Sequence, residues 1–198
     1  MVSFRYFLGP SSEMLHLAPS TVECAFCSKV GDGFDLDAAI RVAHDERKNS
    51  SMFGCPECLL AGRFGFAHNT DVGTLGEAGL RREYPNHRAA PPAFRPDAVE
   101  TLRRTPDVLR WQYEPWLTHC DDFMAYVGTW RPSDFVRNAP NGDGRSLFLR
   151  MTREPDLRHV WDAECPAGAT VPPDSWHPVY YAYRCLHCGE LAGNWDCD

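Results

Sequence analysis

Apolar positions recur along the chain in short groups separated by turn-forming residues. Near the end, Val179, Tyr181 and Tyr183 alternate with other side chains in the pattern of a half-buried strand, and residues 190–195 can run back as its partner. The chain also holds 16 prolines and 15 glycines, which favour turns over long regular elements. We therefore expect an α+β fold of small antiparallel sheets and short helices.

The first half of the chain predicts short elements and one ambiguous segment. Phe4, Tyr6 and Phe7 indicate a first strand or extended arm that ends at Gly9. Residues 34–48 fit helical spacing and strand alternation about equally, so both interpretations stay open. The other expected elements are a helical turn at 59–61 closed by Gly62, an aromatic strand at 63–68, and an ordered loop or interdomain crossing at 71–96.

The second half predicts several short helices. Pro96 stands at the start of an amphipathic segment that carries Val99 and Leu102. A soft boundary near residue 95 divides the chain into an N-terminal half, residues 1–95, and a C-terminal half, residues 96–198, which can also form one continuous domain. Four further helices are expected. One begins at Thr105-Pro106, and a second begins at Asp121-Asp122 and ends at Gly128. The other two lie within residues 144–152 and 154–163.

Cysteine spacing gives the strongest chemical signal in the first half. Cys24 and Cys27 form one C-x2-C pair, and Cys55 and Cys58 form another. Two such pairs supply four thiolates and predict a closed zinc site of the zinc-ribbon or treble-clef kind. The competing interpretation, a redox C-x2-C of the thioredoxin type, requires a single pair that opens a helix within a βαβ unit.

The end of the chain holds an incomplete set of metal ligands. Cys185, Cys188 and Cys197 supply three thiolates, and a structural zinc takes four nitrogen or sulfur ligands. The fourth ligand must therefore come from upstream. Cys120 is the preferred donor, and His119 beside it is the alternative. The spacing predicts a second structural zinc site that ties the tail to the middle of the chain.

The other histidines and the ninth cysteine show no catalytic pattern. We expect Cys165 to be an ordinary thiol and His187 to be a solvent-facing spacer within its C-x2-C pair. The sequence lacks H-E-x-x-H, G-x-S-x-G, a phosphate loop, and the H-x-E that deaminases place before P-C-x-x-C. A zinc hydrolase is therefore the weakest functional alternative, and the scattered histidines are His44, His68, His87, His159 and His177.

Composition limits the cellular setting and the partner. The 198 residues carry a formal charge of −7, which disfavours general binding to phosphate backbones and favours a basic protein partner. Residues 1–10 lack the layout of a secretory signal, and no apolar run approaches the about 18 residues of a membrane span. We expect a cytosolic protein with no membrane association, whose acidic contact segments are Asp32 to Asp37, Asp45-Glu46 and Asp121-Asp122.

Nucleic-acid binding is the alternative of a different class. Basic residues are concentrated in the middle third of the chain, where Trp111 or Trp116 can stack on a base. The acidic balance of the whole chain opposes this interpretation. The basic residues concerned are Arg81, Arg82, Arg88, Arg95, Arg103, Arg104 and Arg110.

Four motifs together resemble the CbrC family of zinc-ribbon-like bacterial proteins linked to tolerance of DNase-type colicins. They are CAFC at 24–27, GCPECLLAGRF at 54–64, RRTPDVLRWQYEPWLTHCDDFMAYVG at 103–128 and YRCLHCGELAGNWDCD at 183–198. The segments 31–54 and 131–177 are longer than the family pattern and differ in composition. By this resemblance the family's cysteines fall on Cys24, Cys27, Cys55, Cys58, Cys120, Cys185, Cys188 and Cys197.

The resemblance implies protection against toxin nucleases rather than a reaction. Together with the acidic charge and the cysteine spacing, it predicts a non-enzymatic protein that holds two structural zinc ions and neutralises a basic nuclease toxin by direct binding.

Overall fold

An antiparallel sheet of three strands lies at the centre of the C-terminal part of the chain. Its order is β12–β13–β14, formed by Ala125–Trp130, Val179–Arg184 and Leu191–Asp196. The structure is a computed structural model, and it describes residues 2–43, 52–81, 94–110, 115–152 and 158–196.

Strand β13 is buried on both faces, which differs from the half-buried strand that its alternation predicts. Tyr181 and Tyr183 belong to one hydrophobic core, whereas Tyr180 and Ala182 belong to the other. Strand β14 pairs closely with it, because a Cβ on Gly193 would lie 2.4 Å from the Tyr181 carbonyl oxygen. The strand therefore divides two cores instead of covering one.

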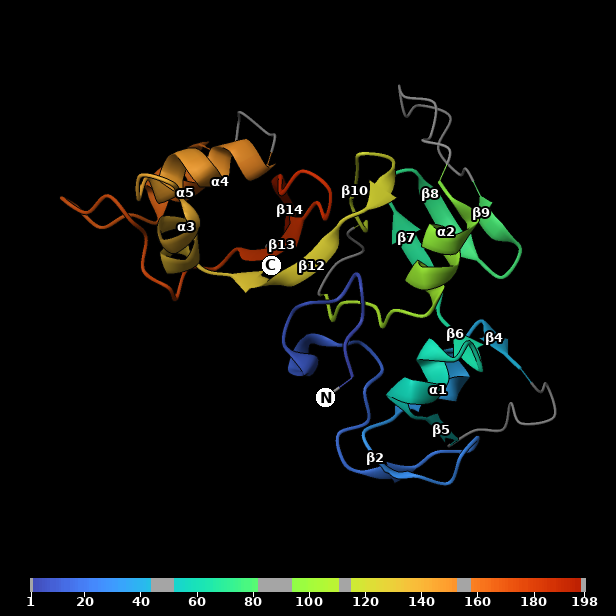
Figure 1. Cartoon of the computed structure of the whole chain (residues 1–198). Helices are drawn as coiled ribbons and strands as arrows, with labels where there is room; N and C mark the ends of the chain where they lie inside the picture. Colours follow the sequence, from blue (N-terminus) through green and yellow to red (C-terminus); the bar gives the residue numbers. More distant parts are fainter. Residues whose placement is uncertain (1, 44–51, 82–93, 111–114, 153–157, 197–198) are drawn as a thin grey trace.

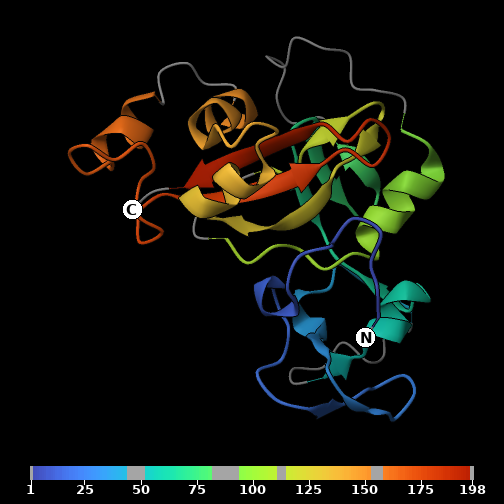
Figure 2. The ribbon, with the colours of Figure 1, turned by 60° about the vertical axis from the view of Figure 1, so that its left-hand side comes forward.

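Three short helices pack on one side of this sheet. They are α3 (Pro132–Asn138), α4 (Gly144–Thr152) and α5 (Arg158–Ala163), and α4 and α5 lie on the side away from the N-terminal segment (Figure 2). Their core is largely aromatic. The rings of Phe135 and Tyr180 meet edge to face with centroids 4.8 Å apart. Such rings bury large areas, so this core fixes the helices with few residues.

The N-terminal arm packs on the other side of the sheet. Phe7 forms an isolated parallel bridge with Tyr126, and the Tyr126 amide donates to the Tyr6 carbonyl over 2.8 Å. Phe4 is also buried, at 1% exposure. The larger core joins this arm to residues on both sides of residue 95. The arm is therefore extended and anchored, but it forms no strand of a sheet.

Small elements make up the rest of the described chain (Figure 1). The two-stranded pairs are β1 (Val22–Glu23) with β2 (Val30–Gly31), β3 (Phe34–Asp35) with β5 (Phe53–Gly54), β4 (Arg41–Val42) with β6 (Phe64–Gly65), and β10 (Thr118–His119) with β11 (Asp122–Phe123). A second three-stranded sheet contains β7 (His68–Thr70), β8 (Gly73–Gly76) and β9 (Gly79–Arg81). The remaining helices are α1 (Pro56–Leu60), α2 (Pro96–Arg103) and the 3-10 turns Ser11–Glu13 and Leu36–Ala38.

The predicted fold class is confirmed, as are the elements that local signals mark. The tail hairpin, the helical turn before Gly62 and the helix that begins at Pro96 all form. Two short helices also form near the predicted ranges 144–152 and 154–163.

Three predicted elements are wrong. The segment after Asp121-Asp122 forms a strand, because residues 125–130 pair with β13. The segment after Thr105-Pro106 is extended, because Val108 bridges to Met14. The start of the predicted loop at 71–96 forms β8 and β9, and residues 82–93 of that loop lie outside the described residues. In the first two cases a partner distant in the sequence decides the backbone conformation, whereas β8 and β9 form local hairpins with neighbouring strands.

Residues 34–43 form neither a long helix nor a long strand. Strands β3 and β4 flank a 3-10 turn in which the Asp35 carboxylate accepts the amide of Asp37 over 2.9 Å. Residues 44–48 of the ambiguous segment lie outside the described residues. None of the helices that the structure describes has the length and apolar character needed to cross a bilayer.

Candidate metal centres

Two turns of the chain share the same hydrogen bonding around a C-x2-C pair. In the first, the Cys24 amide donates to the Lys29 carbonyl over 2.9 Å, and the Ser28 amide donates to the Cys24 carbonyl over 2.9 Å. Ser28 adopts φ of 57°, a left-handed conformation that closes the turn. We call this turn, residues 24–29, the first knuckle.

The second knuckle, residues 185–190, repeats this pattern at the end of the β13–β14 hairpin. The Cys185 amide donates to the Glu190 carbonyl over 2.8 Å, and the Gly189 amide donates to the Cys185 carbonyl over 3.0 Å. Gly189 adopts φ of 78°, where a glycine avoids the strain of a Cβ. Each knuckle therefore presents its two sulfur atoms from the same backbone frame.

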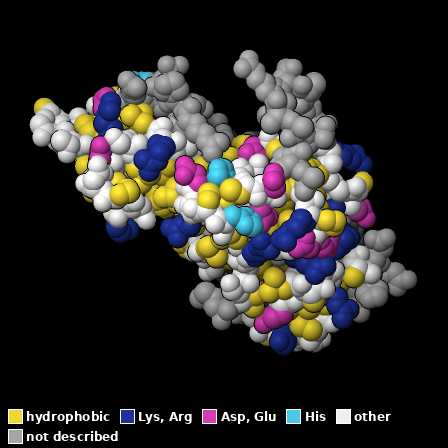
Figure 3. Space-filling view, turned by 45° about the horizontal axis from the view of Figure 1, so that its top comes forward, with side chains coloured by type: hydrophobic (Ala, Val, Ile, Leu, Met, Phe, Trp, Pro, Cys, Tyr) yellow, Lys and Arg dark blue, Asp and Glu magenta, His cyan; other side chains and the backbone are white. Residues whose placement is uncertain are grey.

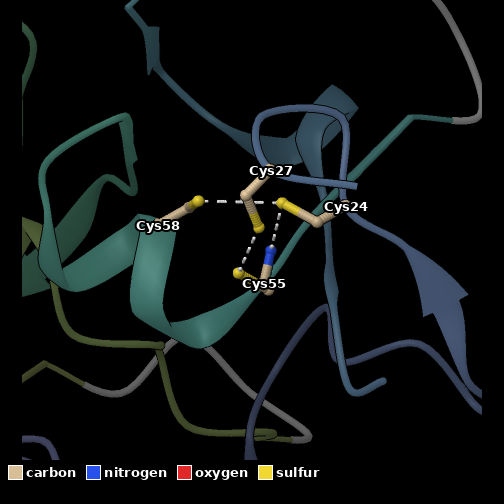
Figure 4. A group of neighbouring side chains, drawn as sticks. All are labelled: Cys24, Cys27, Cys55 and Cys58. Atoms are coloured by element: carbon tan, nitrogen blue, oxygen red, sulfur yellow. Dashed lines mark hydrogen bonds between the residues drawn. The ribbon is translucent and has the colours of Figure 1, made fainter. Parts of the chain in front are cut away.

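The first knuckle meets the start of helix α1, which supplies Cys55 and Cys58 (Figure 4). Pro56 fixes the first turn of this helix. The Sγ atoms of Cys24 and Cys58 are 3.7 Å apart, and those of Cys27 and Cys55 are 3.6 Å apart. We call these four residues the first cluster. All four Sγ atoms lie within 4.8 Å of one another, which confirms that both C-x2-C pairs converge.

These separations fit a tetrahedral metal site. With metal–sulfur bonds of about 2.3 Å, the edges of a tetrahedron of zinc ligands measure about 3.8 Å. A disulfide requires about 2.05 Å between sulfurs. The described cysteines form no disulfide. The first cluster therefore has the spacing of four ligands around one ion.

The second knuckle meets the tight turn between β10 and β11. Cys120 and Asp121 both adopt left-handed conformations, with φ of 52° and 56°. Two consecutive residues of this kind make the type I′ turn that suits a two-residue hairpin. His119 precedes them, paired with Asp122 across the hairpin. The turn therefore presents two neighbouring donors, one imidazole and one thiol, to the second knuckle.

Four donor atoms converge here as well. The Cys120 Sγ lies 3.8 Å from the Cys188 Sγ, and His119 Nδ1 lies 3.2 Å from the first and 3.4 Å from the second. With Cys185, all four donor atoms lie within 4.8 Å of one another. We call His119, Cys120, Cys185 and Cys188 the second cluster. The structure thus brings the alternative donor His119 together with three of the predicted cysteines.

Cys197, the fourth predicted cysteine of this site, lies outside the described residues, so its role stays a prediction. Strand β14 pairs Leu191 with Arg184 and Asp196 with Val179. Asp196 therefore lies at the end of the hairpin opposite the second knuckle.

Burial and hydrogen bonds shift the thiol pKa values in both clusters. Burial opposes ionisation of Cys24 and Cys185, but backbone amides that donate to their sulfurs lower the pKa to about 7 in Cys24 and about 6 in Cys185. Burial raises the pKa of Cys58 to about 11, and a hydrogen bond with Cys188 raises that of Cys120 to about 11. Close thiolates repel one another, and a divalent cation removes that penalty. Both clusters therefore suit a bound cation.

A buried carboxylate links the second cluster to the N-terminal arm. Asp122 accepts hydrogen bonds from the Tyr6 hydroxyl over 2.5 Å and from Arg5 over 2.7 Å, and its Oδ2 lies 2.9 Å from His187 Nε2. Burial opposes ionisation of Asp122, but these donors lower its pKa. Asp122 is thus a structural residue and not part of an acidic contact surface. Its pairing with the arm had no sequence signal, because the partners are more than 100 residues apart.

The other predicted contact residues divide between exposed and engaged groups. Asp32, Asp37 and Asp121 are exposed, whereas Asp45 and Glu46 lie outside the described residues. Among the arginines, Arg103 and Arg104 pair with Glu100, Arg110 pairs with Asp107, and Arg95 pairs with Asp97.

The aromatic residue proposed for base stacking is not accessible. Trp116 is fully buried, and its Nε1 donates to the Met124 carbonyl over 2.8 Å. The prediction that it stacks on a base is therefore wrong, because its ring belongs to the core. Residues Arg82, Arg88 and Trp111 lie outside the described residues.

One of the scattered histidines is buried in the core. His68 is 1% exposed, packs edge to face on Trp116, and lies 3.7 Å from Asp107. Cys165 is half-buried and belongs to neither cluster.

Two comparisons with known proteins cover nearly the whole chain. The model of the family described as "Uncharacterised protein family (UPF0167)" matches residues 1–197. A UPF0167 protein of Pseudomonas aeruginosa is 26% identical over 189 residues, which cover 94% of this chain and 92% of that protein. No solved structure matches. Because the family match spans nearly every residue, both clusters lie within it, and the chain belongs to the UPF0167 family, also known as the CbrC family.

Proposed function

We propose that this protein is a zinc-stabilised binding protein, in which two structural zinc ions stabilise the fold that presents a surface to a protein partner. The observation that carries the proposal is the pair of four-donor clusters. In each cluster, a knuckle meets a turn that is distant in the sequence, so one ion in each cluster would fasten two separate parts of the chain.

Zinc fits the donors better than other common ions. Thiolate sulfur and imidazole nitrogen are the usual ligands of structural zinc, whereas magnesium and calcium prefer oxygen. Cys24, Cys27, Cys55 and Cys58 would hold the first ion. His119, Cys120, Cys185 and Cys188 would hold the second. The bound ions would supply positive charge that keeps the thiolates ionised.

Scaffolding fits these sites better than catalysis. A catalytic zinc keeps one coordination position open for water or substrate. Four protein donors in each cluster would complete the tetrahedral shell of a bound ion. We therefore infer that the metal shapes the protein and that function lies at its surface.

The acidic balance supports a basic partner. The formal charge is −7, and Asp32, Asp37 and Asp121 are exposed. Figure 3 shows that acidic and basic side chains are interspersed on the face it presents, with no broad basic region for a nucleic-acid backbone. Nuclease surfaces that grip phosphates are positive, so complementary charge would raise the association rate and selectivity. A nuclease toxin of the colicin DNase type is the proposed partner.

A direct binding assay tests this proposal. The zinc-loaded protein is immobilised and titrated with a purified colicin-type DNase domain over a series of salt concentrations. We expect saturable binding that weakens with salt, together with inhibition of DNA cleavage. Hen lysozyme, a basic protein without nuclease activity, is the matched control. Equal binding of both proteins, or DNA cleavage unchanged by excess protein, would reject the toxin as partner.

A further inference from the structure

A pocket of about 330 Å³ lies between the N-terminal arm, the first knuckle and the start of helix α1. Phe4 and Phe34 line it and are almost fully buried themselves, with ring centroids 6.4 Å apart. Val2 and Met14 extend this apolar floor. The pocket is large enough for one or two side chains, and the core beneath it holds its shape.

One wall of the pocket is strand β2, which directly follows the first knuckle. Val30 and Gly31 form β2, whose one strand neighbour among the described residues is β1 (Figure 1). The side chain of Val30 is also highly exposed for an apolar residue, at 73%.

The hairpin register decides which backbone groups β2 leaves available. The Cys24 amide bonds to the Lys29 carbonyl, so the adjacent pair, Glu23 with Val30, is a non-hydrogen-bonded pair of the antiparallel ladder. The amide and carbonyl of Val30 therefore point away from β1. An exposed strand edge of this kind can pair with an extended peptide.

Charge at the rim selects among extended peptides. Asp32 and Glu57 line the pocket with Lys29, and all three side chains are largely exposed. Lys29 lies 3.9 Å from Glu57, so the rim keeps one negative charge in excess. A lysine or arginine on the bound segment would complement this excess, whereas an acidic residue would be repelled.

We propose that this pocket binds an extended segment of a partner protein in which apolar and basic residues alternate. The segment pairs with Val30, places an apolar side chain on the Phe4–Phe34 floor, and sets a lysine or arginine beside Asp32 and Glu57. Residues two apart share a face of a strand, so alternation directs the apolar and basic side chains to opposite sides. The inference rests on the proposed binding function and names the surface that performs it.

Three labelled heptapeptides test the chemistry of this segment by fluorescence anisotropy with the zinc-loaded full chain. The first alternates lysine with valine or phenylalanine, the second replaces each lysine by glutamate, and the third replaces each apolar residue by serine. We expect the first to bind at least about tenfold more tightly than either of the others. Equal affinities, or no binding of the first peptide, would overturn the proposal.

Two variants test the location. Asp32→Lys reverses the charge of that rim residue and should weaken binding of the first peptide about tenfold. Asp37→Lys makes the same charge change on an exposed residue outside the pocket and should leave binding unchanged. Val30→Pro deletes the outward amide and should also abolish binding; zinc content and melting temperature show whether it folds. Equal effects of Asp32→Lys and Asp37→Lys would place the peptide elsewhere.

The outcomes separate this inference from the proposed function. If a colicin-type DNase domain binds the Asp32→Lys and Val30→Pro variants as tightly as the wild type, the toxin proposal stands and the pocket is not its site. If the alternating peptide binds the pocket but the DNase domain does not bind the protein, the pocket is supported as a peptide-binding surface and the toxin is rejected as the partner.

Discussion

Each cluster contains a knuckle of the same geometry, and the two clusters differ in the element that completes them. The first knuckle is completed by a helix start, and three of the four cysteines of the first cluster, Cys24, Cys55 and Cys58, are at most 8% exposed. The second is completed by a hairpin turn, and Cys120 and Cys188 are exposed. The same local frame therefore serves in one place inside the core and in the other at the surface.

This difference sets how much of the fold depends on each cluster. Cys24, Cys55 and Cys58 pack in the larger core beside Phe4 and Phe34, so losing the ion there would leave thiolates to be protonated or solvated inside the protein. An ion in the second cluster would fasten the β10–β11 turn to the tail hairpin, whose strands are also held by two aromatic cores. The first cluster should therefore control folding, and the second should control local order.

The largest effect is expected from removing a ligand of the first cluster. Cys58→Ser should lower the free energy of unfolding by an amount on the order of 10 kcal/mol, the contribution of a structural zinc, which rivals the stability of a whole domain. We expect little soluble folded protein by circular dichroism. Cys188→Ser, which removes the second cysteine of the C-x2-C pair in the second cluster, is the matched control. It should fold, melt at a lower temperature and retain the first ion. Equal losses from both variants would remove the distinction.

Exposure should also separate the rates at which the two ions leave. With a chromogenic chelator in excess, we expect release in two phases, because the chelator reaches Cys120 and Cys188 without opening the core. Cys188→Ser should eliminate the fast phase and leave the slow one unchanged. A single phase that accounts for both ions would show that the clusters are equally accessible.

The fourth ligand of the second cluster gives a smaller and sharper test. His119→Ala removes a donor atom, so it should lower the affinity of the second cluster for its ion. The loss should exceed the about 10–100-fold that removing a residue hydrogen-bonded to a ligand costs. Cys197→Ser should leave that affinity unchanged. Competition titration with a zinc indicator measures both variants. The reverse result would make Cys197 the ligand and His119 a neighbour.

The smallest effect is expected at the ninth cysteine. Cys165 is half-buried and lies outside both clusters. Cys165→Ser should change the free energy of unfolding by within about 0.5 kcal/mol and leave the metal content unchanged. Loss of an ion in this variant would show that a ligand had been assigned wrongly.

The sequence predicted the features whose signals are local. The C-x2-C spacing marks both knuckles, Gly62 marks the end of the helical turn at α1, and proline marks the start of α2. The convergence of Cys24, Cys27, Cys55 and Cys58 followed from counting ligands. Cys120 was placed with the tail for the same reason.

Features that depend on distant parts of the chain were not predicted. The apolar residues Phe123, Met124, Tyr126 and Val127 suit a helix by their spacing, yet β12 is a strand because β13 lies beside it. The choice between His119 and Cys120 also depended on geometry, since a tight turn presents both donors at once. The link from Asp122 to Arg5 and Tyr6 joins residues too distant for any periodic pattern to connect.

Native mass spectrometry of the purified full chain tests the central claim most directly. The account predicts two zinc ions per molecule, one for each cluster, and the loss of one ion in Cys188→Ser. A folded, metal-free chain whose mass shows the paired loss of hydrogens that disulfides produce would contradict it.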